Sequence, residues 1–155
     1  MRVRSAKQGD IEGILALYRQ LHPEDPVIAD GRDRLVFSEI MESRNLHLFV
    51  AEEEGRIVST CYLNLIPNLT RNAAPYGILE NVVTDDDYRN RGFGKAVVQC
   101  ALAFAWEAGC YKVMLQTGSR RESVHVFYRS CGFSGNDKHA FVARAPDGKD
   151  GKEFS

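Results

Sequence analysis

Near its N-terminus the chain carries apolar side chains at the spacing of one helix face. Asp10, a residue type favoured at helix N-caps, precedes a first pattern whose apolar positions are Ile11, Ile14, Leu15, Tyr18 and Leu21. Two prolines and a glycine interrupt it within residues 22–31, and a second pattern has on one face Val36, Phe37, Ile40 and Met41. Two amphipathic helices are therefore predicted, with a strand around Val3 before them.

The middle of the chain changes to β-rich runs. Residues 46–52 and 57–66 are two such runs, and the Glu-Glu-Gly-Arg segment between them predicts an antiparallel hairpin. Residues 67–75 are predicted to form a loop. Further strands are predicted over residues 76–84, 111–117 and 138–144.

Two later segments return to helical spacing. The first runs from Ala96 to Ala108, has an apolar stripe and ends near Gly109, a typical residue just beyond a helix C-terminus. The second is short, is stopped by Gly132, and has on one face Val124, Phe127, Tyr128 and Cys131. The order of elements predicts an α/β fold, with a sheet of about six to seven strands and about four helices on its two faces.

The loop before the third predicted helix has the features of a phosphate site. Backbone N–H groups at a helix N-terminus attract anions, and Gly92 and Gly94 let the main chain approach a ligand closely. Arg89, Arg91 and Lys95 add positive charge, while the acidic run at 85–87 is expected to be solvated and to point away.

Two common phosphate loops do not fit this stretch. A Walker A loop needs Ser or Thr after its Gly-Lys, and Ala96 follows Lys95. A dinucleotide fingerprint needs a third glycine where Val97 stands.

The segment Arg89-Asn90-Arg91-Gly92-Phe93-Gly94 does match the pattern Arg/Gln-x-x-Gly-x-Gly/Ala, and at this point the chain resembles the GNAT family of acyl-CoA-dependent N-acyltransferases. The segment His125-Val126-Phe127-Tyr128-Arg129-Ser130-Cys131-Gly132-Phe133 is similar to the closing motif of that family. The resemblance spans residues 78–133. It implies a GNAT fold with a mixed central sheet and a single catalytic domain over residues 1–145. The segment over 146–155 is polar and contains glycine, so it is expected to be a flexible tail.

The resemblance also implies acetyl-CoA as co-substrate. In the family, the loop and helix start bind the pyrophosphate, and a bulge in the preceding strand frees backbone groups for the pantetheine arm. The positions that match are Val82, Val83, Thr84, Arg89, Asn90, Arg91, Gly92, Phe93, Gly94 and Lys95.

Acyl transfer to an amine needs a group that accepts the amine proton, because an alkyl amine of pKa near ~10 arrives protonated at neutral pH. Glu80 interrupts an apolar strand just before the loop, and we expect it to be the general base, directly or through water, with its proton affinity raised by burial. A surface position or a structural ion pair is the alternative for Glu80. By resemblance, Tyr128 is the general acid for the leaving thiolate, and a core residue is its alternative.

The sequence does not name the acceptor amine. The run around Glu80 and Asn81 resembles glucosamine-6-phosphate N-acetyltransferases, although these have Asp where this chain has Asn81. Arg71, Asn81 and Ser119 are candidate acceptor contacts, and a solvated turn is the alternative for Ser119. A small-molecule primary amine is the expected acceptor; a protein or peptide amine, or a non-catalytic acyl-CoA sensor, are the alternatives.

Composition narrows the remaining function classes. The net charge of -1 argues against nucleic-acid binding, and no apolar run approaches the ~18 residues of a membrane span. The four histidines and four cysteines lack metal-ligand spacing, so we expect no metal and reduced cysteines in or near the core. Without a signal-peptide pattern, a cytoplasmic location is expected, and homodimerisation is an expectation from the family alone.

Overall fold

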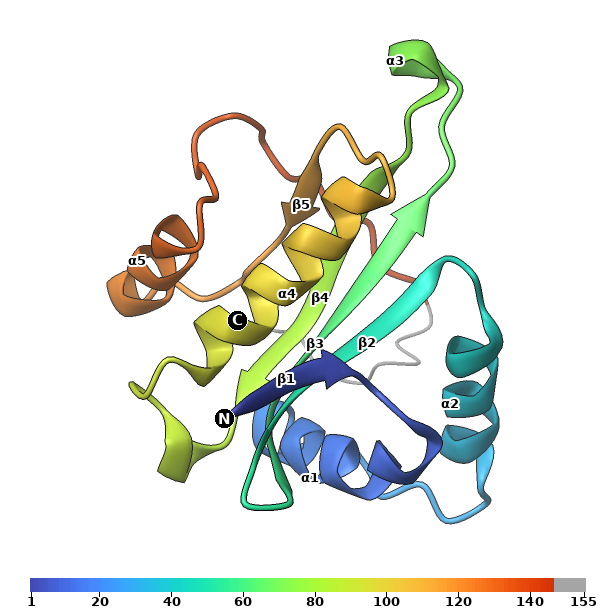
Figure 1. Ribbon diagram of the computed structural model, residues 1–155, viewed down its shortest axis with the longest axis vertical. Helices are drawn as coiled ribbons and strands as arrows, with labels where there is room; N and C mark the ends of the chain where they lie inside the picture. The colour runs from blue at the N-terminus through green and yellow to red at the C-terminus, as the bar shows by residue number, and fades with distance from the viewer. Residues whose placement is uncertain (147–155) are drawn as a thin grey trace.

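Five strands form one mixed sheet in the order β1-β2-β3-β4-β5 in the computed structural model, which describes residues 1–146 (Figure 1). The strands are β1 Arg2–Ser5, β2 Leu46–Glu53, β3 Arg56–Ile66, β4 Tyr76–Thr84 and β5 Val113–Leu115. The first four are antiparallel neighbours, and β5 runs parallel to β4. The predicted strand near Val3, the hairpin and the strand over 76–84 are confirmed.

Helices cover both faces of this sheet. They are α1 Ile11–Leu21, α2 Arg32–Glu42, α3 Thr70–Ala73, α4 Phe93–Glu107 and α5 Glu122–Ser130, with short 3-10 helices η1 Gln8–Asp10 and η2 Asp86–Tyr88. α4 lies across one face, α1 and α2 lie on the other, and α5 stands beyond β5 (Figure 1). The predicted α/β class, the mixed sheet and the two-sided helix layers are confirmed.

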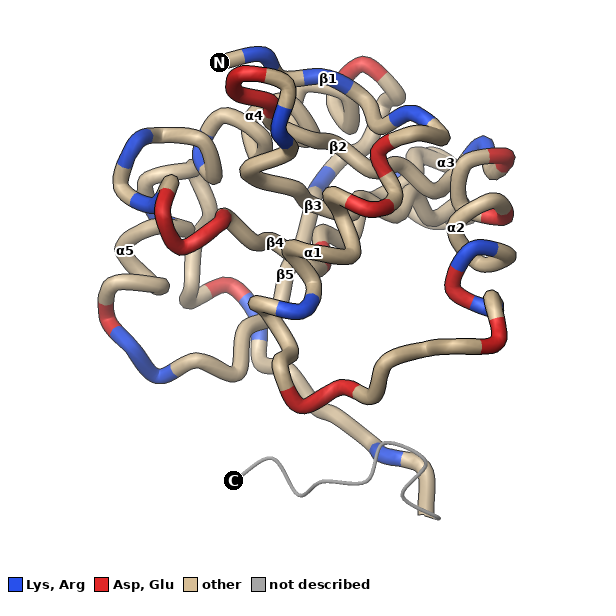
Figure 2. The backbone as a smooth tube through the Cα atoms, turned by 90° about the horizontal axis from the view of Figure 1, so that it is seen from below, with Lys and Arg blue, Asp and Glu red and all other residues tan. Residues whose placement is uncertain are grey.

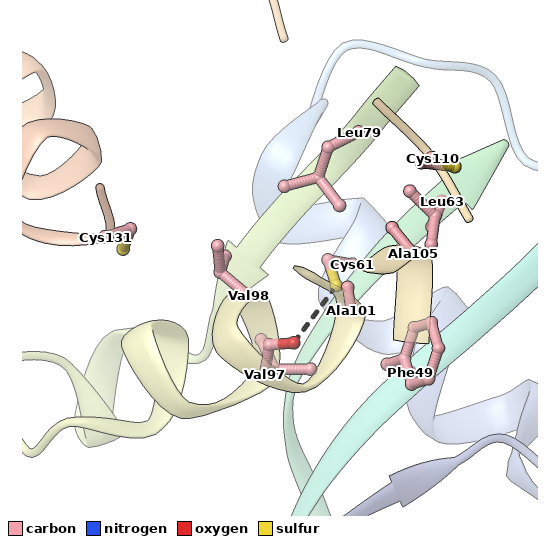
Figure 3. Packing of buried hydrophobic residues seen from close by; sticks show 10 residues of the cluster. All are labelled: Phe49, Cys61, Leu63, Leu79, Val97, Val98, Ala101, Ala105, Cys110 and Cys131. Atoms are coloured by element: carbon pink, nitrogen blue, oxygen red, sulfur yellow. Dashed lines mark hydrogen bonds between the residues drawn. The ribbon is translucent and has the colours of Figure 1, made fainter. Parts of the chain in front are cut away.

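The larger core lies between α4 and the sheet. α4 presents Val97, Val98, Ala101 and Ala105 to Phe49, Cys61, Leu63 and Leu79 of the strands (Figure 3). The two alanines let the helix approach the sheet, and the Cys61 thiol donates to the carbonyl of Val97 at 3.6 Å. All four cysteines are free thiols, and Cys61, Cys110 and Cys131 are buried, as predicted.

The smaller core, on the other face, corrects one prediction. Ile14 of α1 and Phe37 of α2 pack on Leu48 and Val50 of β2. Val36, predicted to share this face, has 51% of its surface exposed. α2 contacts the sheet through a narrow stripe, and Val36 falls outside it.

The strand count was predicted too high. Residues 138–144 form no strand, and Phe141 is 92% exposed. A strand needs a neighbour to pair with, and β5, with only three residues, presents a short edge. β5 is also shorter than the predicted 111–117, and nearly all of the predicted tail, residues 147–155, lies outside the described residues.

The side chain of Asp10 caps a different turn from the one predicted. It accepts from the backbone N–H of Lys7 at 2.7 Å and so caps the turn of η1, rather than making a side-chain cap for α1.

Across residues 1–146, every helix is too short or too polar to cross a membrane.

Candidate functional site

β4 and β5 pair over only part of the length of β4. The two strands pair only from Gly77 and Val113 to Leu79 and Leu115, whereas β4 continues to Thr84. Beyond Leu79, the β4 edge that faces away from β3 has no strand partner among residues 1–146. Its backbone groups can therefore pair with an extended ligand.

A β-bulge sits at the start of this free edge. Glu80 lies opposite Tyr62 and Val83 opposite Thr60, so two residues of β4, Asn81 and Val82, face the single residue Cys61 of β3. Asn81 has φ 50°, a left-handed conformation that Asn tolerates better than most residues. The predicted bulge at 82–84 is thus found one residue earlier, because the left-handed residue is Asn81.

Glu80 projects from the face of the sheet that carries α1 and α2, since its partner Tyr62 packs in that core. Its side chain is exposed. The expected burial of Glu80 is therefore wrong, although α1 reaches the next residue of β4, Asn81, through Tyr18. An exposed carboxylate is accessible to a substrate.

Tyr128 of α5 is the second predicted catalytic residue, and it is half-buried. Its ring packs edge-on against Phe127 at 5.1 Å and Phe133 at 6.2 Å. Burial raises the pKa of the Tyr128 phenol, and the nearby groups Cys131, Cys61 and Glu80 raise it further. Glu80 of β4 thus lies near enough to Tyr128 of α5 to act on its pKa, and burial favours the protonated phenol.

Tyr18 belongs to the same region and was missed from the sequence. Burial raises the pKa of Tyr18, and a hydrogen bond with the Asn81 side chain acts in the opposite direction. Its place on the apolar stripe of α1 marked it only as a core residue. Nothing in the local pattern signals a contact between α1 and the bulge.

The loop before α4 ends in an open helix N-terminus. Gly92 is the N-cap with φ 87°, no side chain caps the helix, and its first turn has no acidic residue. Asn90 is also left-handed, with φ 61°. The backbone N–H groups of this turn are thus available to an anion.

The three cations of the loop differ in their partners. Arg89 pairs with Asp86 at 2.5 Å and donates to the carbonyl of Thr84 at 3.4 Å. Arg91 lies over the rings of Tyr88 at 4.8 Å and Phe93 at 5.3 Å. Lys95 is exposed, and within residues 1–146 neither it nor Arg91 has a carboxylate partner.

Several predicted cofactor positions are core residues whose backbone alone can face a ligand. The Phe93 side chain is buried with Ala51 and Val58, and Val83 is buried while its carbonyl accepts from Ser59 at 3.0 Å. At Gly94, a Cβ would lie 2.9 Å from the Thr84 hydroxyl and 3.4 Å from the Phe127 ring. The close approach at Gly94 is thus made by β4 and α5.

The prediction that the whole acidic run 85–87 is solvated is wrong for its first residue. Asp85 is 3% exposed, pairs with Arg56 at 2.7 Å and accepts from the Gln20 amide of α1 at 3.1 Å. Asp86 and Asp87 are exposed. Acidic and basic positions are interspersed around the described backbone (Figure 2), and residues 1–146 contain no group of His, Cys, Asp or Glu suited to a metal ion.

Two candidate acceptor residues stand apart from the bulge. Arg71 lies in α3, at the tip of the β3–β4 hairpin (Figure 1), where residues 71–73 all have positive φ. Its guanidinium lies 5.9 Å from the Tyr111 ring, and the Lys112 amine lies 5.3 Å from the same ring. Ser119 follows β5; its hydroxyl accepts from the N–H of Arg121 at 3.3 Å.

The family model described as "Acetyltransferase (GNAT) family" matches residues 12–133 of this chain, a span that includes the bulge, the loop before α4 and Tyr128. The chain belongs to the GNAT family. It is an acyl-CoA-dependent N-acetyltransferase, an enzyme that transfers acetyl groups to amines, and the predicted family resemblance is confirmed.

Named relatives place the chain near one branch of that family. It is 33% identical to glucosamine 6-phosphate N-acetyltransferase of Arabidopsis thaliana over 126 residues, 79% of this chain and 82% of that protein. The solved structure of an Arabidopsis thaliana enzyme of that name has a TM-score of 0.81 at 29% identity, covering 94% of this chain and 98% of that one. The predicted local resemblance to these enzymes is confirmed.

A bacterial structure is similar over a comparable span. A protein of Agrobacterium tumefaciens str. C58 that carries a provisional acetyltransferase name has a TM-score of 0.89 and 45% identity, covering 94% of this chain and all of that one. A Trypanosoma brucei brucei glucosamine 6-phosphate N-acetyltransferase is 34% identical over 91 residues, 59% of this chain and 60% of that protein.

Proposed function

We propose that this GNAT enzyme transfers the acetyl group of acetyl-CoA to a primary amine of a small molecule by direct attack. The observation that supports it best is the electrostatic interaction of Glu80 with Tyr128, in a chain where β4 has a free edge beyond Leu79 and α4 begins without a side-chain cap. A carboxylate, a protonated phenol and an anion site are the three parts that the reaction needs.

The residues divide the work as follows. The first turn of α4 with Arg91 and Lys95 holds the pyrophosphate, and the backbone of Val82–Thr84 pairs with the pantetheine arm. Glu80 takes the proton of the ammonium, so that the amine nitrogen can form the new bond to the thioester carbon. Tyr128 gives its proton to the sulfur as the carbon–sulfur bond breaks, and the second proton that the nitrogen loses on becoming an amide restores the phenol. Because Glu80 is exposed, a bridging water can carry the first proton.

The acceptor that we propose carries an anionic group besides its amine. Arg71 and Lys112 converge on the Tyr111 ring, and neither has a carboxylate partner among residues 1–146. Tyr76 and Glu80 lie on one face of β4, four residues and so ~13 Å apart, and Lys112 also lies over the Tyr76 ring at 5.3 Å. Hexosamine phosphates, the substrates named for several relatives, fit this chemistry.

The test is thiol release from acetyl-CoA with a panel of amines: hexosamine phosphates, neutral hexosamines, aminoglycosides, polyamines, amino acids and peptides. Amine-dependent release that collapses in Glu80→Gln and Tyr128→Phe, but not in the control Glu107→Gln at the end of α4, is the expected result. Release only with peptides would favour a protein acetyltransferase. Tight acetyl-CoA binding without release for any amine would favour the sensor alternative.

A further inference from the structure

Asp85 is a buried carboxylate at the junction between β4 and the loop that leads to α4. It is 3% exposed, and it accepts hydrogen bonds from Arg56 of β3 at 2.7 Å, from Gln20 of α1 at 3.1 Å and from the N–H of Asp87 at 3.0 Å. Burial raises the pKa of Asp85, but these donors and the Arg56 charge outweigh it, so the pKa lies below its usual range. The carboxylate is therefore charged and held from three sides.

Gln20 makes a second bond to the same loop. While its amide N–H donates to Asp85, its carbonyl oxygen accepts from the backbone N–H of Asp86 at 3.1 Å. The backbone N–H of Asp85 in turn donates to the carbonyl of Val58 at 2.9 Å. The first two residues of the loop are thus fastened to both α1 and β3.

Tyr88 extends this fastening to the start of α4. Its ring lies between two guanidinium groups, with Arg56 at 5.5 Å and Arg91 at 4.8 Å from its centre, and it packs edge-on against Phe93 at 5.7 Å. Phe93 is the first residue of α4. Arg56 therefore touches both the carboxylate that anchors the loop and the ring on which Arg91 rests.

We propose that Gln20, Arg56 and Asp85 form a clamp that positions the 85–92 loop and the α4 N-terminus for the pyrophosphate of acetyl-CoA. This inference rests on the proposed function of that loop. None of the three is a catalytic residue. An exposed carboxylate next to a phosphate site would repel the ligand. Asp85 is buried and its charge is balanced by Arg56, so its effect is to hold the loop in place.

Comparing two thioester substrates distinguishes an effect of a substitution on loop positioning from an effect on protein stability. Acetyl-CoA uses the phosphate site, whereas S-acetylpantetheine has the same thioester and arm but no pyrophosphate. In Asp85→Asn we expect kcat/KM for acetyl-CoA to fall about tenfold, mainly through KM, the size expected for losing a charge-assisted hydrogen bond. The value for S-acetylpantetheine should stay within about twofold of wild type, because that substrate does not use the loop.

The chain supplies a matched control in Asp10. Asp10 pairs with Arg4 at 2.6 Å and accepts from the N–H of Lys7, so its environment parallels that of Asp85, but it has no bond to the loop. Asp10→Asn should lower the free energy of unfolding and leave the ratio of the two kcat/KM values unchanged. Gln20→Ala alters an exposed side chain that no core packing needs, and it should shift the ratio in the same direction as Asp85→Asn.

The outcomes are distinct. If wild type prefers acetyl-CoA and the Asp85 and Gln20 variants lose that preference while Asp10→Asn keeps it, the clamp is supported. If those two variants keep the wild-type preference, or lower both values equally, the clamp is wrong although the phosphate site stands. If wild type uses both thioesters equally well, the proposed phosphate site itself is wrong, and the clamp is overturned with it.

Discussion

Glu80 of β4 and Tyr128 of α5 lie close enough for the carboxylate to add to the rise in the Tyr128 pKa that burial begins. The two groups therefore complement each other: one is a solvent-accessible proton acceptor, and the other is a phenol held in its protonated form. A carboxylate that is open to solvent and a phenol that burial keeps protonated are suited to accept and to donate a proton, respectively.

The first prediction concerns Tyr128→Phe. The variant keeps the ring that packs against Phe127 and Phe133 and removes only the proton donor, so kcat should fall by about 10²–10⁴-fold. The dissociation constant for acetyl-CoA, measured by calorimetry, should remain near that of wild type. A variant with nearly normal kcat would show that another group protonates the leaving thiolate.

The second prediction is a loss of stability at alkaline pH. Burial raises the pKa of the Cys61 thiol and of the Tyr18 and Tyr128 phenols above their unfolded values, which are about 8.5 for Cys and about 10 for Tyr. The folded state then binds more protons than the unfolded state above about pH 8.5, so the free energy of unfolding should decrease as pH rises beyond it.

Urea titrations at a series of pH values above neutrality measure this decrease. Cys61→Ala provides the comparison, since it removes one of the thiols whose pKa burial raises, a set that also includes Cys100, Cys110 and Cys131. Its own cavity lowers the overall stability, but the decline just above about pH 8.5, where unfolded thiols titrate, should be shallower than in wild type. A free energy that stays flat or rises over this range would contradict the assignment.

The sequence predicted those parts of the fold that depend on local pattern. β4 begins and ends where its β-rich run does, and the hairpin turn follows from Gly55, whereas α4 begins at Phe93 and not at the predicted Ala96. Contacts between distant segments could not be read in the same way. Tyr18 is an ordinary position on an apolar helix stripe until the fold brings it to Asn81.

Burial was the least predictable property of the site. Glu80 lies in the middle of β4 and Asp85 directly follows it, yet the first is exposed and the second is buried, with hydrogen bonds from Gln20 of α1 and Arg56 of β3. Likewise, the residue pattern over 138–144 is compatible with a strand, but it does not contain the information on whether a sheet edge is available to pair with that strand.

The third prediction concerns Gly94→Ala. The added Cβ would lie 2.9 Å from the Thr84 hydroxyl, which cannot turn aside without losing its 2.8 Å hydrogen bond with Ser59. We expect a loss of ~1–3 kcal/mol in the free energy of unfolding and a higher KM for acetyl-CoA, since β4 and α4 must separate. Gly9→Ala, where nothing lies within 4 Å, is the control and should change neither value. Equal behaviour of the two variants would refute the steric account.

The last prediction tests the bulge through Asn81. With φ 50°, this residue sits where a β-branched side chain is strained, so Asn81→Val should cost ~1–2 kcal/mol of stability and draw β4 toward regular pairing. Regular pairing would move Glu80 relative to Tyr128 and occupy the backbone groups of Val82, so kcat should fall more than stability alone explains. Asn81→Gly permits the same backbone conformation and should retain most of the activity.

Asn64→Val is the matched control for this series. Asn64 lies on β3 opposite Ile78, in ordinary strand conformation, and its amide donates to the Ile78 carbonyl at 3.3 Å. The same substitution there removes a hydrogen bond without straining the backbone, so kcat should stay near that of wild type. If Asn81→Val turned over as fast as Asn64→Val, the left-handed residue would be incidental, and Glu80 would owe its position to pairing with Tyr62 alone. Slow turnover in Asn81→Val only, with recovery in Asn81→Gly, ties the catalytic geometry to the backbone conformation of one residue.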